Sequence, residues 1–272
     1  MARLSMNEIT TFSWSFEEDV RNYVAAGIDG IAVWRQKLSD FGEEKGAELL
    51  ADSPLSVSSL LWAGGFTGSD GRTYKDSVED AIEAVRLAAD LKAGALVIYS
   101  GSRSGHTHNH ARRLFKSALK ELTPVASEFG VVLAVEPMHE GCAGDWTFLT
   151  GLDDSLDFVR SVDCPQLKLV FDAYHLGHDR IALERLHEIA PLIAIVQLGD
   201  AKRPPTGEQN RCRLGEGYIP LKEIIAGLTE AGYGGFFDVE LMGEDVENSD
   251  YGELIEHSKR AFAELLQPSA SR

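Results

Sequence analysis

The 272-residue sequence has few cysteines, no long apolar run and a shortage of basic residues. Three cysteines are too few, and odd in number, for a disulfide framework, and they are typical of reduced thiols in a cytosolic protein. No stretch reaches the ~18 apolar residues of a membrane span. The first ten residues, MARLSMNEIT, contain no apolar run of signal-peptide length. The sequence therefore predicts a soluble, cytoplasmic protein without a membrane partner.

The shortage of basic residues gives the chain a strongly acidic balance. Its 43 Asp and Glu against 26 Lys and Arg leave a formal net charge of −17. Non-specific binding to duplex nucleic acid needs a basic surface, so we expect no nucleic-acid partner. A small anionic substrate is not excluded, because a local Arg or a helix N-terminus can hold one phosphate.

A short β-type run followed by an amphipathic helical stretch recurs along the whole chain. The clearest helical stretches include residues 78–91 and 111–129. The second half contains four continuous, apolar, β-branched runs, typical of parallel strands buried on both faces: 131–137, 167–172, 192–198 and 236–241. Eight such units of about 34 residues, with no linker, predict one domain over residues 1–272, a single (β/α)8 TIM barrel. A doubly wound open sheet is the alternative, although the sequence has neither GxGxxG after the first strand nor a P-loop.

Polar side chains stand at the ends of the last four predicted strands. They are Glu136, Asp172, Gln197 and Glu240. In a barrel these ends meet at the C-terminal rim, where active sites form. A lone carboxylate there is more often a helix N-cap or a loop salt bridge. Several carboxylates around one cavity repel each other, and a divalent cation would relieve that repulsion. The all-oxygen set therefore predicts one metal site, better suited to Mn²⁺ or Mg²⁺ than to Zn²⁺.

Five motifs carry a family resemblance: LAVEPMH, LVFDAYHLGHD, IVQLGD, NRCRLGEGYIPL and DVELMGE, in this order. Together they resemble the xylose-isomerase-like sugar phosphate isomerase/epimerase family. The resemblance implies a TIM barrel with one divalent metal, here on Glu136, Asp172, Gln197 and Glu240. Gln197 stands where the commonest family pattern has His, and its amide oxygen favours Mn²⁺ or Mg²⁺. Cys142 stands where ketose 3-epimerases often carry a further carboxylate, which argues against that strict specificity.

The resemblance also implies roles for residues beside the metal. His175, in the FDAYH motif, is expected to hold a substrate hydroxyl, and Arg211 to polarise or position a substrate oxygen. Arg213 lies two residues further along and could share the role of Arg211. Spacing and resemblance together predict that Glu136 and Glu240, at opposite ends of the four-strand arc, form the acid/base pair.

Further candidates lie in predicted loops at the same rim. His139 is a candidate for substrate contact, because its loop leaves the strand beside a ligand. Trp34 is either a core residue or a wall against the face of a sugar, and Trp62 and Trp146 are open to the same two interpretations. Asp200 could touch the metal or orient a ligand, and it ranks below the four predicted ligands.

These residues predict a divalent-metal-dependent isomerase or epimerase that acts on a sugar, keto-sugar or keto-inositol. The reaction would remove a proton next to a carbonyl through an enediolate. β-Elimination from the same intermediate, which would make the protein a lyase or dehydratase, stays open, as does a non-catalytic sugar-binding barrel. An endonuclease-type hydrolase with several zinc ions would need many His ligands and a basic DNA-binding face. The acidic net charge and the single His at a matching core position argue against it. A non-phosphorylated substrate is favoured because no Gly-rich phosphate loop occurs late in the chain. The sequence leaves a homo-oligomer open.

Overall fold

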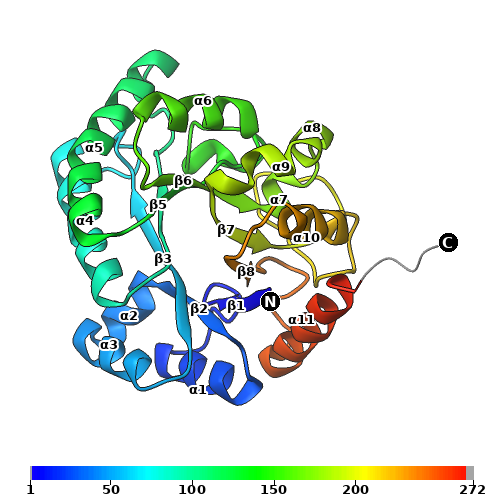
Figure 1. The fold of residues 1–272 in the computed structure, drawn as a ribbon. Coiled ribbons are helices and arrows are strands. Elements are labelled where there is room, and N and C mark those ends of the chain that lie inside the picture. The colour runs from blue at the N-terminus through cyan, green and yellow to red at the C-terminus, as the bar shows by residue number, and fades with distance from the viewer. Residues whose placement is uncertain (1, 268–272) are drawn as a thin grey trace.

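Eight parallel strands form a closed barrel in the order β1 to β8 in the computed structural model, which describes residues 2–267 (Figure 1). The ring closes between the first and last strands, where Leu4 pairs with Phe237 and Met6 with Val239. The closed ring confirms the predicted (β/α)8 barrel over the open sheet. Residue 1 and residues 268–272 of the predicted domain lie outside the described residues. The strands are β1 (Arg3–Asn7), β2 (Gly30–Trp34), β3 (Ser56–Gly64), β4 (Leu96–Tyr99), β5 (Leu133–Val135), β6 (Leu167–Asp172), β7 (Ile193–Leu198) and β8 (Phe236–Val239).

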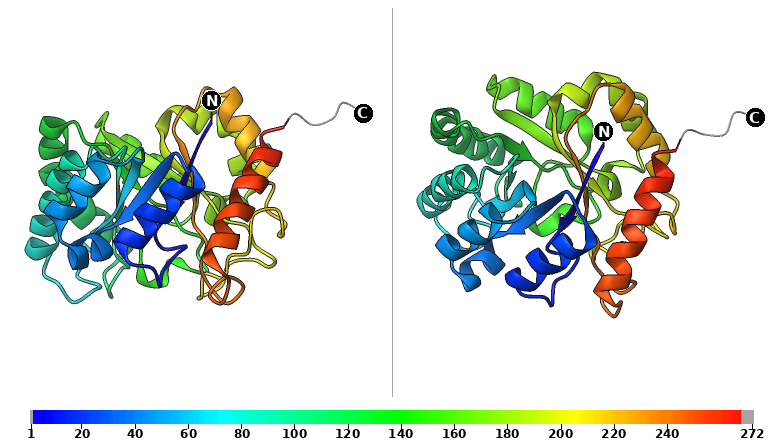
Figure 2. Two further views of the ribbon diagram at one scale, coloured as in Figure 1. Left: turned by 90° about the horizontal axis from the view of Figure 1, so that it is seen from below. Right: turned by 60° about the horizontal axis from the view of Figure 1, so that its bottom comes forward.

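Helices follow the strands and surround the barrel (Figures 1 and 2). The first and last helices, α1 and α11, lie side by side and complete the outer ring where β1 meets β8. No helix within residues 2–267 is long and apolar enough to cross a membrane. The α-helices are α1 (Phe16–Ala26), α2 (Arg35–Phe41), α3 (Glu43–Ala51), α4 (Tyr74–Asp90), α5 (His108–Phe129), α6 (Leu152–Val162), α7 (Ala173–Leu176), α8 (Arg180–Glu184), α9 (Leu186–Ile189), α10 (Leu221–Glu230) and α11 (Tyr251–Leu265), and the short 3₁₀ helices are η1 (Ala143–Asp145) and η2 (Ala190–Leu192).

Two helices begin a few residues earlier than the apolar periodicity predicts. Helix α4 begins at Tyr74 because Thr73 and Asp76 form a capping box, in which each side chain accepts a hydrogen bond from the other residue's backbone N–H. Helix α5 begins at His108 because the Thr107 side chain caps it. Both caps are polar residues that lie before the first apolar turn, so periodicity alone misses them.

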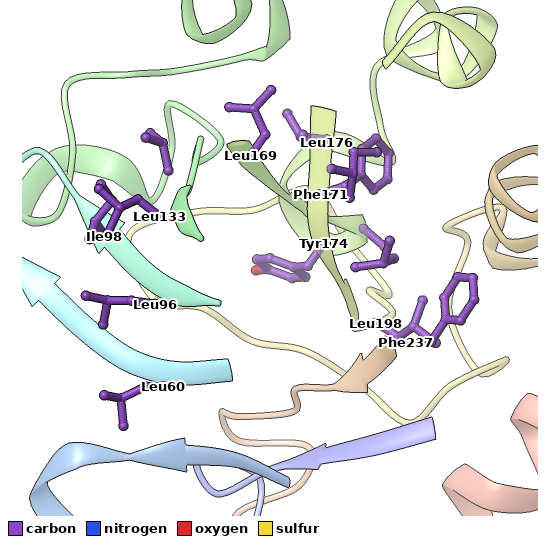
Figure 3. Close-up of a cluster of buried hydrophobic side chains, with 14 of the residues drawn as sticks. Leu60, Leu96, Ile98, Leu133, Leu169, Phe171, Tyr174, Leu176, Leu198 and Phe237 are labelled. Atoms are coloured by element: carbon purple, nitrogen blue, oxygen red, sulfur yellow. The ribbon is translucent and has the colours of Figure 1, made fainter. Parts of the chain in front are cut away.

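Successive strand residues point to opposite faces of the barrel wall. One face packs outward on the helices in a large apolar cluster that includes Leu96, Leu133, Leu169 and Leu198 (Figure 3). The other face points into the barrel, where a smaller apolar cluster fills the interior below the carboxyl ends of the strands. Its buried members are Ala32, Leu61, Ala95, Val97, Ala134, Val170 and Ile195.

Candidate active site

The four predicted metal ligands point into the barrel at the carboxyl ends of strands β5 to β8. Side chains two residues apart on a strand share a face, so each ligand lies one layer above an inward residue of its own strand. All four ligands are buried at the carboxyl ends of the strands, where barrel active sites form. Along the chain, Glu136 lies two residues after Ala134, Asp172 after Val170, Gln197 after Ile195, and Glu240 after Asp238.

Arg211 lies fully buried between two of these carboxylates. Its Nη2 atom is 2.8 Å from Asp172 Oδ2 and 3.0 Å from Glu240 Oε1. The Tyr174 ring packs against the guanidinium, with its centroid 4.8 Å from the Arg211 Cζ atom. Burial opposes the positive charge of Arg211, but the neighbouring carboxylates outweigh burial and raise the pKa of the guanidinium above its usual range. The structure thus makes Arg211 the counterion of the site.

Glu136, Asp172 and His175 form a compact group that could hold a metal ion. One ligand atom from each lies within 4.8 Å of the other two. Within the described residues, neither ring nitrogen of His175 has a hydrogen-bond partner. Burial lowers the pKa of His175 to about 4, so the ring is neutral at pH 7 and keeps a free nitrogen lone pair. His175, predicted only as a substrate contact, therefore also lies within reach of a metal.

Glu240 is held in place by two amides. Its Oε2 atom accepts hydrogen bonds from Gln197 Nε2 at 2.5 Å and from Asn7 Nδ2 at 2.8 Å. Asn7 Nδ2 also donates to Asp238 Oδ2, at 3.0 Å. Gln197 Oε1 is buried and accepts no hydrogen bond in the described part of the chain. A buried amide oxygen without a partner suits an oxygen-binding cation, which agrees with the predicted role of Gln197.

The charges of the site also fit a divalent cation. When ionised, Glu136, Asp172 and Glu240 together exceed the single charge of Arg211 by two. Burial, followed by repulsion from Glu240 and Asp172, raises the pKa of Glu136 well above its usual value. Burial likewise raises the pKa of Glu240 to about 7, although Arg211 opposes the shift. A bound divalent ion would neutralise the excess and allow the carboxylates to ionise.

A cavity of about 630 Å³ opens over the site. Gln197, within β7, and Glu136 and Glu240, which directly follow β5 and β8, contribute to its lining. Trp34, Trp62 and Trp146, which the sequence left as core or wall, also line the cavity and are only half-buried. Large apolar side chains with a few convergent polar groups are typical of small-molecule sites.

Two predicted substrate contacts do not line this cavity. His139 accepts a hydrogen bond at Nδ1 from the Gly141 backbone N–H, and its ring packs against His178 with centroids 5.7 Å apart. Arg213 is half-buried and donates to Ser249 Oγ at 3.4 Å. Because neither side chain lines the cavity, their contact with substrate stays a prediction.

Asp200 anchors a loop. Its Oδ1 atom accepts from the backbone N–H groups of Ala201 and Ile219 at 2.8 and 3.1 Å, and its Oδ2 atom from those of Gly215 and Gly217 at 3.0 and 2.9 Å. A Cβ atom on Gly217 would lie 2.1 Å from Asp200 Oδ1, which accounts for the glycine. Four backbone donors occupy this carboxylate, so it positions the loop after β7 rather than a metal.

Comparison with known proteins identifies the family of the chain. The sequence profile described as xylose isomerase-like TIM barrel matches residues 20–262. The chain belongs to the xylose isomerase-like TIM-barrel family. Among curated relatives, an inosose isomerase of Halalkalibacterium halodurans is 24% identical over 221 residues, which cover 78% of this chain and 75% of that protein. The chain spans 58–61% of the length of other curated relatives it matches, among them an L-ribulose-5-phosphate 3-epimerase of Escherichia coli.

Two solved structures superpose over nearly the whole barrel. A protein from Sinorhizobium meliloti is 25% identical with a TM-score of 0.90, over 97% of this chain and 98% of that one. The IolI protein, solved with a bound zinc atom, is 20% identical with a TM-score of 0.83, over the same shares of the two chains. These structures support the fold, and the zinc belongs to IolI.

Proposed function

We propose that the protein is a divalent-metal-dependent isomerase or epimerase of an uncharged sugar, keto-sugar or keto-inositol. The observation that carries the proposal is the pair Glu136 and Glu240, two buried carboxyl groups with raised pKa values that line one cavity beside a possible metal-binding group. The similarity to an inosose isomerase supports a carbonyl-bearing ring as substrate.

Glu136, Asp172, Gln197 and Glu240 would hold the metal, with His175 beside them. Carboxylate and amide oxygens favour Mn²⁺ or Mg²⁺, and the zinc bound by IolI, a protein of the same fold, supports a metal without deciding its identity. When bound, a divalent ion would supply Lewis-acid stabilisation of the negative charge that develops on the substrate carbonyl oxygen.

The protein's own side chains would move the proton. A carboxyl group with a pKa near 7 can both take and return a proton at neutral pH, which the chemistry next to a carbonyl requires. Asn7 and Gln197 hold Glu240 at Oε2 and Arg211 pairs with it at Oε1, so this carboxylate is fixed toward the cavity. Glu136 would serve as its partner, and neutral His175 would hold a substrate hydroxyl.

A deuterium-exchange screen tests the proposal. Uncharged ketoses and keto-inositols would be incubated with the protein and Mn²⁺ in D₂O, and mass spectrometry would follow the substrate. We expect deuterium uptake by at least one compound, with an isomer as product. Uptake accompanied by loss of water would identify a lyase instead, and absence of uptake from every compound, despite sugar binding, would identify a non-catalytic barrel.

Metal binding should weaken as the pH falls below 7. Burial raises the pKa of Glu240 from 4.5 to about 7, so below pH 7 the metal must displace a proton from this carboxyl. One released proton corresponds to about a tenfold loss of Mn²⁺ affinity per pH unit. Calorimetric titration in two buffers of different ionisation enthalpy measures the proton release, and the Glu240→Gln variant should release fewer protons. An affinity that is the same at pH 6 and pH 8 would contradict this assignment.

A further inference from the structure

Five aromatic rings form a continuous wall along one side of the cavity. We call this wall the aromatic arc, formed by Phe12, Trp34, Trp62, Trp146 and Tyr99, all of which line the cavity. In that order, the centroids of successive rings are 5.7, 6.4, 5.7 and 5.8 Å apart. The arc comes from the β1 to β5 side of the rim, whereas the carboxylates and Gln197 come from β5 to β8. The cavity thus has the aromatic rings on one side and the carboxylates on the other.

The aromatic arc is not part of the closed core. Phe12 is 63% exposed, and the other four rings are only half-buried. Three of the protein's four tryptophans belong to it. Leaving apolar surface of this size in water forfeits the free energy of burial, and such patches mark binding sites. One sugar ring can stack on one or two of these rings, so the arc offers more apolar surface than a single sugar covers.

The cavity offers no positive charge to an anionic group. No Lys, Arg or His occurs among the described residues that line it, whereas Glu247 joins the two proposed catalytic glutamates. Arg35 and Arg72 line an adjoining pocket that shares Trp34, Trp62 and Tyr99 with the cavity, and each is already paired with Asp80, at 2.8 and 3.0 Å. Arg211 is already the counterion of two carboxylates. Away from the metal site, a phosphate or carboxylate on the substrate would therefore find no cationic side chain in the lining of the cavity.

We propose that the substrate is an uncharged keto-glycoside with an apolar, ring-containing aglycone. The sugar ring lies over Glu136 and Glu240, and the aglycone lies against the aromatic arc. The volume of about 630 Å³ is within the ~300–1,000 Å³ of pockets that bind ligands larger than one sugar ring. This inference rests on the proposed function, because it takes the carboxylate half of the cavity as the place of the reacting ring.

Isothermal titration calorimetry with three probes tests the inference in the Mn²⁺-loaded protein. The probes are phenyl β-D-glucopyranoside and methyl β-D-glucopyranoside, which are unreactive analogues because they lack a ring carbonyl, and glucose 6-phosphate. We expect the phenyl glucoside to bind about tenfold tighter than the methyl glucoside, a difference of about 1.4 kcal/mol. Glucose 6-phosphate should bind more weakly than either glucoside.

Matched variants test whether the aromatic arc causes the preference for the phenyl glucoside. Phe12→Ala and Trp34→Ala should each lower the affinity for the phenyl glucoside several-fold and leave the affinity for the methyl glucoside unchanged. Phe129→Ala removes a phenylalanine that is 43% exposed at the end of α5 and outside the cavity, and it should change neither affinity. Phe12 is mostly exposed, so its variant should fold even if Trp34→Ala does not.

Equal affinity for the two glucosides, no binding of either, or tightest binding of glucose 6-phosphate would overturn the inference. The measurement needs no turnover, so its failure is separate from failure of the proposed function. A protein that prefers the phenyl glucoside and exchanges no deuterium contradicts only the proposed chemistry. One that exchanges deuterium with a simple ketose and has no phenyl preference contradicts only the aglycone site.

Discussion

Replacement of Glu240 by glutamine is expected to lower turnover by about 10²-fold or more. The amide has nearly the same shape as the carboxylate but cannot take up the substrate proton. Asn7 donates to Glu240 Oε2 and Arg211 pairs with its Oε1, so the wild-type group is held rigidly where the proposed reaction occurs. The measurement is the steady-state rate with the substrate found in the deuterium screen, at saturating Mn²⁺.

Saturating metal separates the two roles of this residue. If Glu240 only binds the metal, excess Mn²⁺ restores turnover in Glu240→Gln. If it transfers the proton, turnover and deuterium exchange stay low together. Glu244→Gln is the matched control, because Glu244 follows the same strand, is 72% exposed and does not line the cavity. Near-wild-type turnover of Glu240→Gln would contradict the acid/base assignment.

Replacement of Lys37 by methionine is expected to lower the free energy of unfolding by about 3–5 kcal/mol. Lys37 Nζ lies 2.6 Å from Asp19 Oδ2, and both side chains are almost inaccessible to solvent. The same ammonium donates to the backbone carbonyls of Glu8 and Thr11, at 3.1 and 2.9 Å. Methionine fills a similar volume but leaves the Asp19 carboxylate buried without its cation.

Urea denaturation at pH 7 measures this loss. Lys75→Met is the matched control, because Lys75 is 79% exposed and pairs with Glu79 at 3.4 Å, so its removal should cost less than about 1 kcal/mol. The loss in Lys37→Met should shrink at lower pH, because protonated Asp19 no longer needs a cation. Burial already raises the pKa of Asp19 above its usual value. A loss below about 1 kcal/mol at pH 7 would contradict the account.

The Lys37 network also supports the cavity. Glu8, at the end of β1, accepts a hydrogen bond at Oε2 from the Trp34 backbone N–H at 2.6 Å. Lys37 holds the backbone of the loop that carries Phe12. Two rings of the aromatic arc are therefore fixed by one buried polar network, which links the stability of the β1 to β2 rim to the shape of the binding cavity.

The sequence predicted the barrel and the polar ends of its last four strands because both depend on local patterns. A continuous apolar run identifies a buried strand, and an interruption such as Glu136 or Asp172 marks its carboxyl end. Residues two apart on a strand share a face, and this rule would have identified two further polar residues. They are Asn7, which shares a face with Ser5 on β1, and Asp238, which lies two residues before Glu240. Asn7 and Asp238 were not predicted, because Asn7 ends β1, outside the last four strands, and Asp238 lies within β8 rather than at its end.

The contacts of Arg211 and Lys37 depend on tertiary structure and could not be predicted. Arg211 lies in the long irregular connection between β7 and α10, where no periodicity determines the direction of a side chain. Its position between Asp172 and Glu240 follows from packing of that loop against Met242, whose carbonyl accepts from the Arg211 backbone N–H. Lys37 is an ordinary helix residue by sequence, and only the fold shows that its partner Asp19 lies on α1.

Arg211 also changes the charge balance that the sequence suggests for the site. Three carboxylates around one divalent ion would leave a net charge of −1, and the buried guanidinium of Arg211 removes it. A neutral site in a cavity whose lining adds one further carboxylate, Glu247, agrees with an uncharged substrate.

The most direct test of the account measures deuterium uptake on one sample before chelation with EDTA, after chelation, and after Mn²⁺ is restored. The substrate is the uncharged keto-sugar or keto-inositol that exchanges in the screen. Metal-dependent proton abstraction at the site of Glu136 and Glu240 predicts uptake in the first and third states and at least a 10²-fold slower uptake in the second. Uptake at the same rate in all three states would contradict it.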